Sequence, residues 1–499
     1  MTSEYVTVSQ ARTPASSEVD EAVHRCLVAG FEGTATFPDT LKRLIDRGLG
    51  GVILFTRNVR DAEQVRELTD ALRAIRPDLL VAIDNEGGGI GHLVAADAPQ
   101  VPGSYALGVA DDPNLTARCA DALAGHLDTL GITASYAPVA DLQRRPGNPI
   151  VRTRSFGSDP DLAARHLRAW ITATEARGIA SCAKHFPGHG GTETDSHHDM
   201  AVDWRPYEQL CADLEPFRAA VDAGVPMLMS AHVVYSALDP NRPATLSRRI
   251  LGDILRLDLG FEGVLVSDAL EMKAIADRYG EAAGARIALA AGADQVIVAV
   301  PDLEITLGCR DEVLEALRTG RLAEDRVQEA AGRVRRLAER YATPTAGPVA
   351  AWDAGAGLEA ARRAVRAGSV STPVPLPVRG AHVVDLFPPP HPALNWGGED
   401  LLTEVRLVDP AVSGTAVSGE PADPAALAEG ILRVAAKSPL VVATCDAGIH
   451  PWQARLREAL VAGRPDAVRV DTGLPEGGSL CSYGRGKVNL RAVAEVLAG

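Results

Sequence analysis

Residues 184–200, KHFPGHGGTETDSHHDM, form the densest cluster of titratable side chains in the sequence. Lys184 and His185 close an apolar run, and the proline and glycines that follow predict a loop. On this loop Asp195 and His197 are two residues apart, so in an extended backbone they lie on one side and the carboxylate can accept from the imidazole. Such a pair fixes the tautomer and raises the basicity of His197, which a general acid/base requires.

Metal binding is the competing interpretation, because the same segment holds four histidines, His185, His189, His197 and His198. The H-E-x-x-H and C-x-x-C spacings are absent, and histidines on a loop do not define a coordination geometry by themselves. We therefore expect neither a metal nor a cofactor.

Asp268 is the second candidate, in the segment GVLVSDALEM at 263–272. It ends a nearly continuous apolar run, so its carboxylate is presented to a site while its neighbours are buried. This suits a nucleophile that must be ionised yet shielded. The alternative is that Asp268 caps the helix predicted in ALEMKAIADRYG.

The elements that would position these residues follow a repeated pattern of short apolar runs alternating with segments of helical periodicity. Eight runs have the composition of strands buried on both faces: 24–33, 51–58, 79–88, 133–141, 179–190, 226–234, 263–272 and 294–300. Eight βα units over roughly 300 residues predict an α/β fold, a (β/α)8 barrel of the TIM type.

Polar residues close six of the eight runs, which strengthens this interpretation. They are Arg57-Asn58, Asp84, Asp141, Lys184-His185, His232 and Asp268. In a barrel these strand ends converge on one face, where side chains from different strands can meet around a substrate. Taken alone, each of these residues is more simply explained as a polar residue that marks the end of a strand, but six of eight together argue against that explanation.

Length and composition set the limits of the assignment. The chain has 499 residues, 46% of them hydrophobic, which predicts two or three packed domains. A net charge of −15 disfavours nucleic acid and anionic membrane surfaces as partners. The seven cysteines are scattered, and neither a signal peptide nor an apolar stretch long enough for a membrane span is visible. We expect a cytoplasmic protein.

The domain organisation follows from a change in composition after the last barrel helix, predicted at 323–342. Residues 1–342 are expected to form the barrel, and the Pro/Gly/Ala-rich stretch 343–357 a linker. Residues 358–499 are expected to form a small α/β sandwich domain, with a helix at 358–367 and strands at 382–387, 439–445 and 467–471.

Eight segments together resemble one enzyme family: GVILFTRN, AIDNEGGGIGHL, YAPVADL, RTRSFG, CAKHFPGHG, TDSH, MSAHVV and LVSDALEM. They are similar to segments of the glycoside hydrolase family 3 β-N-acetylhexosaminidases, in unbroken order over roughly residues 20 to 340. KHFPGHG followed by DSH is the most specific of these signals. The closing CSYGRGKVNLRAVAEVLAG is similar to the smaller domain of longer members.

The resemblance implies a retaining glycosidase, which attacks the anomeric carbon and forms a covalent glycosyl-enzyme that water then releases. Asp268 matches the family nucleophile, and His197 with Asp195 matches a dyad that replaces the second carboxylate used by most retaining enzymes. The substrate is then a small-molecule glycoside, and we expect a monomer or a homodimer. The positions that match sugar-binding residues are Asp84, His92, Arg154, Lys184 and His185, with Asp141 and His232 at further matching strand ends.

Three departures from the family surround the same pocket. His92 stands where relatives carry an arginine that helps to hold the sugar, Arg152 stands where they favour glycine, and DSHHDM lacks the G-L-P that commonly follows DSH. Histidine offers fewer donors than arginine and is mostly neutral at pH 7. The three departures leave the substrate open, rather than the reaction class. The alternative is a tailoring glycosidase or a phosphorylase that acts on a different sugar or on a secondary metabolite. A non-catalytic sugar-binding protein is the alternative from another class.

Overall fold

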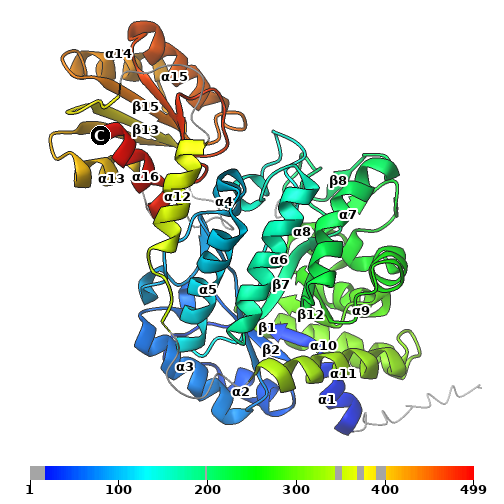
Figure 1. Ribbon diagram of the computed structural model, residues 1–499. Coiled ribbons are helices and arrows are strands. Elements are labelled where there is room, and N and C mark those ends of the chain that lie inside the picture. The colour runs from blue at the N-terminus through cyan, green and yellow to red at the C-terminus, as the bar shows by residue number, and fades with distance from the viewer. Residues whose placement is uncertain (1–16, 197–198, 343–350, 368–375, 389–399) are drawn as a thin grey trace, which may run out of the picture.

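The computed structural model describes residues 17–196, 199–342, 351–367, 376–388 and 400–499. Within these ranges the chain forms a closed barrel surrounded by helices and a smaller sheet flanked by helices, as Figure 1 shows. Both parts were expected from the sequence, and the predicted fold class is confirmed.

Eight parallel strands close the barrel in the order β1-β12-β11-β9-β7-β6-β3-β2. Each lies inside one of the eight predicted runs: β1 (Leu27–Ala29), β2 (Gly51–Leu54), β3 (Leu80–Ile83), β6 (Ala134–Ser135), β7 (Ala180–Phe186), β9 (Met227–Ser230), β11 (Val264–Ala269) and β12 (Gln295–Val298). Their inward side chains, such as Val28, Ile53, Met227 and Ile297, fill the lumen as one apolar cluster. The barrel is therefore a packed core with its site at one end.

Helices cover the outside of the barrel. They are α1 (Ser17–Arg25), α2 (Asp39–Asp46), α3 (Ala62–Ile75), α4 (Ser104–Ala110), α5 (Pro113–Thr129), α6 (Pro160–Ala176), α7 (Tyr207–Asp222), α8 (Lys273–Tyr279), α9 (Glu281–Ala291), α10 (Leu303–Arg318) and α11 (Glu324–Tyr341), with a π-helix η5 (Arg249–Asp258) before β11. Side-chain caps fix the residue at which several of these helices begin. Asp112 and Asp159 each precede a proline and accept from the first free backbone N–H groups of α5 and α6.

Two small ladders extend from the carboxyl ends of the strands and shape the rim of the barrel. The hairpin β4 (Asn85–Gly87) and β5 (Ile90–Gly91) follows β3 directly. β8 (Ala201–Asp203) pairs in parallel with β10 (Val233–Tyr235), which joins the loops after β7 and β9. The second ladder fixes the downstream end of the loop that carries Asp195.

The C-terminal part is a parallel sheet in the order β14-β13-β15-β16-β17. Its strands are β13 (His382–Phe387), β14 (Ser413–Ser418), β15 (Leu440–Thr444), β16 (Val468–Asp471) and β17 (Leu480–Cys481), and its helices are α13 (Leu401–Val408), α14 (Pro424–Val434), α15 (Pro451–Gly463) and α16 (Lys487–Ala498). The three strands expected from the sequence are present. β14 and β17 were not predicted: β14 is a polar edge strand without the apolar run of a buried one, and β17 spans two residues.

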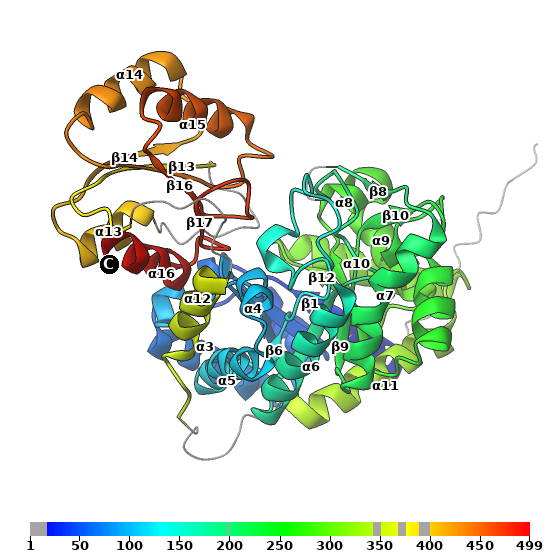
Figure 2. The same cartoon turned by 45° about the horizontal axis from the view of Figure 1, so that its top comes forward.

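The helix α12 (Ala356–Ala367), predicted at 358–367, connects the two parts. It packs against α4 and α5 of the barrel and against α16 of the smaller sheet, as both views in Figures 1 and 2 show. Residues 343–350 of the predicted linker lie outside the described ranges.

Candidate active site

A cavity of about 490 Å³ opens at the carboxyl ends of the barrel strands. Its apolar wall includes Phe55, Tyr136, Met229 and Met272. The polar and charged side chains that line it are Arg57, Asp84, Glu86, His92, Arg154, Lys184, His185, His189, Ser196, Asp268 and Glu271. Six of the ten residues predicted for the site are in this group: Asp84, His92, Arg154, Lys184, His185 and Asp268.

Four of the lining side chains form one network of opposite charges. Lys184 donates to Asp84 at 2.5 Å and contacts Glu86 at 2.7 Å. Arg154 approaches Glu86 through two bonds of 2.8 Å each. Burial alone would raise the pKa of Glu86, but the Arg154 and Lys184 charges hold it well below its ordinary value. Burial would lower the pKa of Lys184, and Asp84 and Glu86 raise it instead. Glu86 and Lys184 thus remain ionised, and the four side chains hold one another in place.

Asp268 lies near the end of β11, partly exposed at the cavity. Its carboxylate accepts from the backbone N–H of Ala269 at 2.8 Å. The ring of His232, buried below, lies 2.9 Å from the Ala269 carbonyl through Nε2 and 2.8 Å from the Thr245 hydroxyl through Nδ1. The helix that follows begins at Lys273, with Met272 at its N-cap, so Asp268 does not cap it. His232 holds the strand end and does not line the cavity.

Asp141 is fully buried behind the cavity lining. Its carboxylate lies 2.7 Å from Nδ1 of His185 and accepts from the backbone N–H groups of His185 and His189 at 3.1 and 2.7 Å. The contact to Nδ1 orients the His185 ring, whose other face borders the cavity. Asp141 is thus placed to support His185 and not to touch a ligand.

The loop after β7 is partly described. His189 contacts the hydroxyls of Thr192 and Ser196 at 3.0 Å each, and burial lowers its pKa to about 4, so it is neutral at pH 7. Asp195 is buried on this loop, and it is not among the residues that line the cavity. His197, the predicted acid/base, and His198 lie outside the described residues.

His92 projects from the β4–β5 hairpin region into the cavity. Its Nδ1 lies 3.0 Å from the Thr56 hydroxyl, and its ring meets that of Phe55 edge to face with centroids 5.1 Å apart. Burial lowers the pKa of His92. The position where the family resemblance implies an arginine thus holds a neutral imidazole.

Five polar lining residues were not nominated as site residues from the sequence: Arg57, Glu86, His189, Ser196 and Glu271. Glu271 accepts from the Ala299 backbone N–H, and burial, with the nearby Asp268 charge, raises its pKa. Arg57 donates to the carbonyls of Phe31 and Ala299. The spacing of Asp268 and Glu271 in SDALE, and of Asp84 and Glu86 in DNE, was the available signal. Each pair closes a buried strand with two carboxylates.

Within the described ranges, no three His, Cys, Asp or Glu side chains converge in a way that could hold a metal ion. Of the four histidines that the metal hypothesis names, the two that the structure describes have other partners: His185 contacts Asp141, and His189 contacts two hydroxyls. No described helix has the length and apolar character that a membrane crossing needs.

A TIM-type barrel whose strand ends surround a cavity lined by carboxylates and by arginine, lysine and histidine side chains is an arrangement found in glycoside hydrolases. The chain belongs to the glycosyl hydrolase family 3, because residues 19–337 match the model of its N-terminal domain.

Relatives of known name agree. A β-hexosaminidase of Pseudomonas aeruginosa is 43% identical over 255 residues, 50% of this chain and 75% of that protein. The family 3 β-N-acetylglucosaminidase of Paenibacillus sp. FPU-7 is similar over 96% of both chains, with 30% identity and a TM-score of 0.86. The NagZ protein of Neisseria gonorrhoeae, solved with N-trifluoroacetyl-D-glucosamine, is 34% identical with a TM-score of 0.55, over 62% of this chain and 89% of that one.

Proposed function

We propose that this chain is a retaining β-N-acetylglucosaminidase-like glycosidase that removes a terminal β-linked N-acetylhexosamine from a small glycoside. The observation that carries the proposal is the cavity in which Asp268 faces the fixed Asp84–Lys184–Glu86–Arg154 network. Two negative and two positive charges cancel, so the network suits a neutral sugar whose hydroxyls both donate and accept. The names of the relatives support the N-acetylhexosamine.

The proposed reaction has two steps. The Asp268 carboxylate attacks the anomeric carbon while the bond to the leaving oxygen breaks, and the imidazolium of His197 gives a proton to that oxygen and becomes neutral. His197, paired with Asp195, then takes a proton from a water molecule, which attacks the anomeric carbon and breaks the ester to Asp268. A neutral imidazole places no second negative charge beside the nucleophile.

The test is release of p-nitrophenol from its N-acetyl-β-glucosaminide by the purified chain. We expect Asp268→Ala to lower kcat by on the order of 10⁴-fold, and the surface control Asp253→Ala to retain activity. A 2-fluoro sugar should label the peptide that contains Asp268, as detected by mass spectrometry. Full activity of Asp268→Ala would reject Asp268 as the nucleophile. No release of p-nitrophenol by the wild type, together with no label on that peptide, would favour a non-catalytic sugar-binding protein.

A second candidate keeps the chemistry and changes the sugar or the acceptor, and His92 is the observation that favours it. An imidazole bonded to Thr56 replaces a charged fork of donors at one edge of the cavity. A panel of aryl glycosides assayed with and without phosphate separates the two candidates. Preference for another sugar, or a rate that depends on phosphate, favours the second.

We further propose a cytoplasmic location and a monomeric or homodimeric state. The seven cysteines are all free thiols, and six of them are buried, which suits a reducing compartment. Cell fractionation tests the location, and light scattering on the purified protein tests the oligomeric state.

A further inference from the structure

Arg152 and Arg154 occupy the two ends of a single turn, η3 (Arg152–Arg154), and contact different parts of the protein. Arg154 binds Glu86 in the cavity. Arg152 reaches the C-terminal sheet, and its side chain is 5% exposed. Its backbone φ of +39° lies in the left-handed region, where glycine is the ordinary choice. A non-glycine residue in this conformation requires support from its surroundings.

The guanidinium of Arg152 joins three segments. Its Nη2 donates to Asp446 at 2.7 Å and to Glu476 at 3.0 Å, and its Nη1 donates to the Pro146 carbonyl at 2.8 Å. Glu476 is itself fixed, since its other oxygen accepts from the Gly448 backbone N–H at 2.8 Å. Both carboxylates belong to loops at the carboxyl ends of β15 and β16. The contact therefore ties the turn that carries Arg154 to the rim of the C-terminal sheet.

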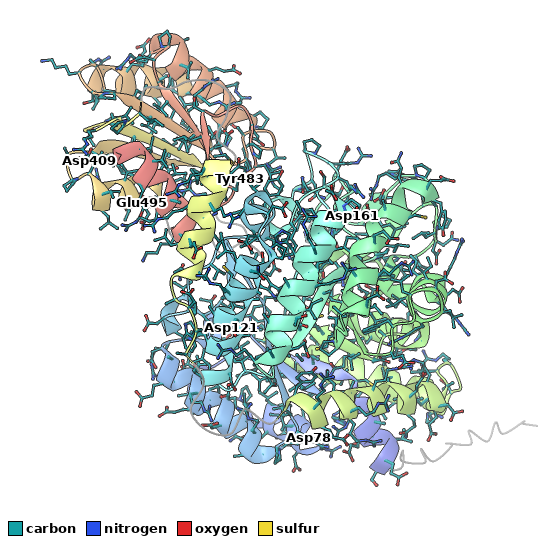
Figure 3. The ribbon with its side chains drawn as sticks, in the orientation of Figure 1. Asp78, Asp121, Asp161, Asp409, Tyr483 and Glu495 are labelled. Atoms are coloured by element: carbon teal, nitrogen blue, oxygen red, sulfur yellow. The ribbon has the colours of Figure 1, made fainter. Side chains whose placement is uncertain are left out.

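The partner of Arg154 is supported from the same side. Glu86 lies on the β4–β5 hairpin, and Gly88 is in the turn of this hairpin. Gly486, the residue before α16, packs so closely against this turn that a Cβ added to Gly486 would lie 3.2 Å from the Gly88 Cα. Close by, Tyr483, labelled in Figure 3, stacks on Tyr105 of α4 with ring centroids 6.1 Å apart. The C-terminal part thus contacts both segments that supply the Glu86–Arg154 pair.

We propose that Arg152 is a positioning residue through which the C-terminal domain holds Arg154 and Glu86 in the geometry that binds the sugar. The inference rests on the proposed function, in which Arg154 touches the substrate. The domain is then part of the binding machinery of the barrel and acts from outside the cavity. Arginine suits this role because its planar fork can engage two carboxylates and a carbonyl at once.

The variant Arg152→Gly tests the proposal in the full chain, because glycine fits the φ of this position and the backbone need not change. We expect KM for the aryl glycoside to rise about tenfold while kcat stays within about twofold, the signature of weakened ground-state and transition-state binding alike. Arg152→Lys, which can reach one carboxylate, should give an intermediate KM. A merely structural role would lower the apparent kcat through loss of folded enzyme and leave KM unchanged.

Arg363→Ala is the matched control. Arg363 of α12 bonds to Asp112 at the start of α5 at 2.5 Å, so it joins α12 to the barrel at an exposed point away from η3. We expect wild-type KM and kcat for this variant. A KM increase equal to that of Arg152→Gly would overturn the proposal, because loosening the domain at any point would then suffice.

Hydrogen exchange gives a readout that does not require turnover. Amides of 150–156 and 85–91 should exchange at least about fivefold faster in Arg152→Gly, and at wild-type rates in Arg363→Ala. Arg152→Gly leaves the carboxylates of Asp446 and Glu476 without their cation, and this could prevent folding. In that case the measurement is made on the triple variant Arg152→Gly/Asp446→Asn/Glu476→Gln, in which both carboxylates are neutral amides. Unchanged exchange and unchanged KM overturn the proposal. If the aryl glycoside is not cleaved by the wild type, the function fails while the exchange result still decides the positioning role.

Discussion

Glu86 and Arg154, 68 positions apart in the chain, meet inside the cavity through two hydrogen bonds of 2.8 Å each. The carboxylate is 3% exposed and also contacts Lys184, so one anion is held between two cations. Asp84 supplies the second negative charge at Lys184. Such a balanced group presents fixed acceptors and donors without a net charge, which is what recognition of a neutral hydroxylated ring requires.

Glu86→Gln should weaken both the fold and sugar binding, because two buried cations lose their shared counterion. We expect the free energy of unfolding in urea to fall by about 3 kcal/mol and KM to rise about tenfold. The control is Glu193→Gln, which removes an exposed partner of Arg145 and should change stability by less than about 1 kcal/mol. Equal losses in the two variants would contradict a special role for Glu86.

The KM should be nearly independent of pH between about 5 and 9. The pKa of Glu86 is lowered from 4.5, so its favourable contribution is complete above that value and is lost only as pH falls through the lower folded pKa. The pKa of Lys184 is raised from 10.5, so its contribution is complete below that value and is lost above it. Steady-state kinetics across this range checks the point. A KM that changes more than about threefold below pH 6 would show that the charge network takes up a proton within the tested range.

The barrel could be predicted from the sequence because its strands are buried on both faces and each leaves an uninterrupted apolar run, of which 226–234 and 263–272 are clear examples. Asp84, Lys184 and Asp268 could be nominated because they end such runs. Glu86 was missed although it follows Asp84 by two residues, since its contacts depend on the β4–β5 hairpin and on an arginine far away in the sequence. β14 was missed because an exposed edge strand of SGTAVS has no apolar period.

The contacts of Arg152 were equally hidden from sequence reasoning. The sequence showed a large side chain where relatives favour glycine, and only the fold places Asp446 and Glu476, about 300 residues later, against it. Long-range ion pairs leave no local pattern, since neither partner changes the periodicity of its own segment. The unusual Arg152 was visible in the sequence. Its ion pairs with the C-terminal domain, which explain it, are visible only in the folded structure.

Asp141→Ala should reduce activity through His185, although Asp141 does not border the cavity. The substitution removes the acceptor for Nδ1 of His185 and leaves two buried backbone N–H groups without their acceptor. Because the His185 ring is then no longer held in one orientation, we expect kcat/KM to fall about 10- to 100-fold. Asp141→Asn retains one carbonyl oxygen and should lose less. Measuring kcat/KM of both variants shows whether Asp141→Asn keeps more activity than Asp141→Ala. Equal activity in the two variants would refute the role of the Asp141 carboxylate as an acceptor.

His189 should make the protein less stable in mild acid. Its pKa is about 4 in the folded chain and 6.5 in the unfolded chain, so between these values the unfolded state binds the additional proton. Stability therefore falls as pH decreases, by about 2 kcal/mol from this group between pH 7 and pH 5. Urea unfolding of His189→Gln at the two pH values should show a decrease smaller by that amount. The same decrease in variant and wild type would mean that His189 is not the cause.

His92→Arg tests which sugar the cavity is built for. The imidazole bonds to the Thr56 hydroxyl and packs against Phe55, and burial keeps it neutral. An arginine at this position, which the family resemblance implies, adds several charged donors to the cavity. If the terminal sugar is an N-acetylglucosamine, the added contact is worth about 1–3 kcal/mol. We then expect kcat/KM on its aryl glycoside to rise by about 5- to 150-fold.

The control for this variant is His92→Gln, which keeps a neutral donor and acceptor and should change kcat/KM by less than about threefold. Both proteins are assayed on the same panel of aryl glycosides as the wild type. A loss of activity on the N-acetylglucosaminide in His92→Arg, with the wild type faster on another sugar, would contradict the N-acetylglucosamine assignment. It would show instead that the neutral imidazole is the feature by which this chain selects a different ring, since the only change made is the charge and reach of one lining side chain.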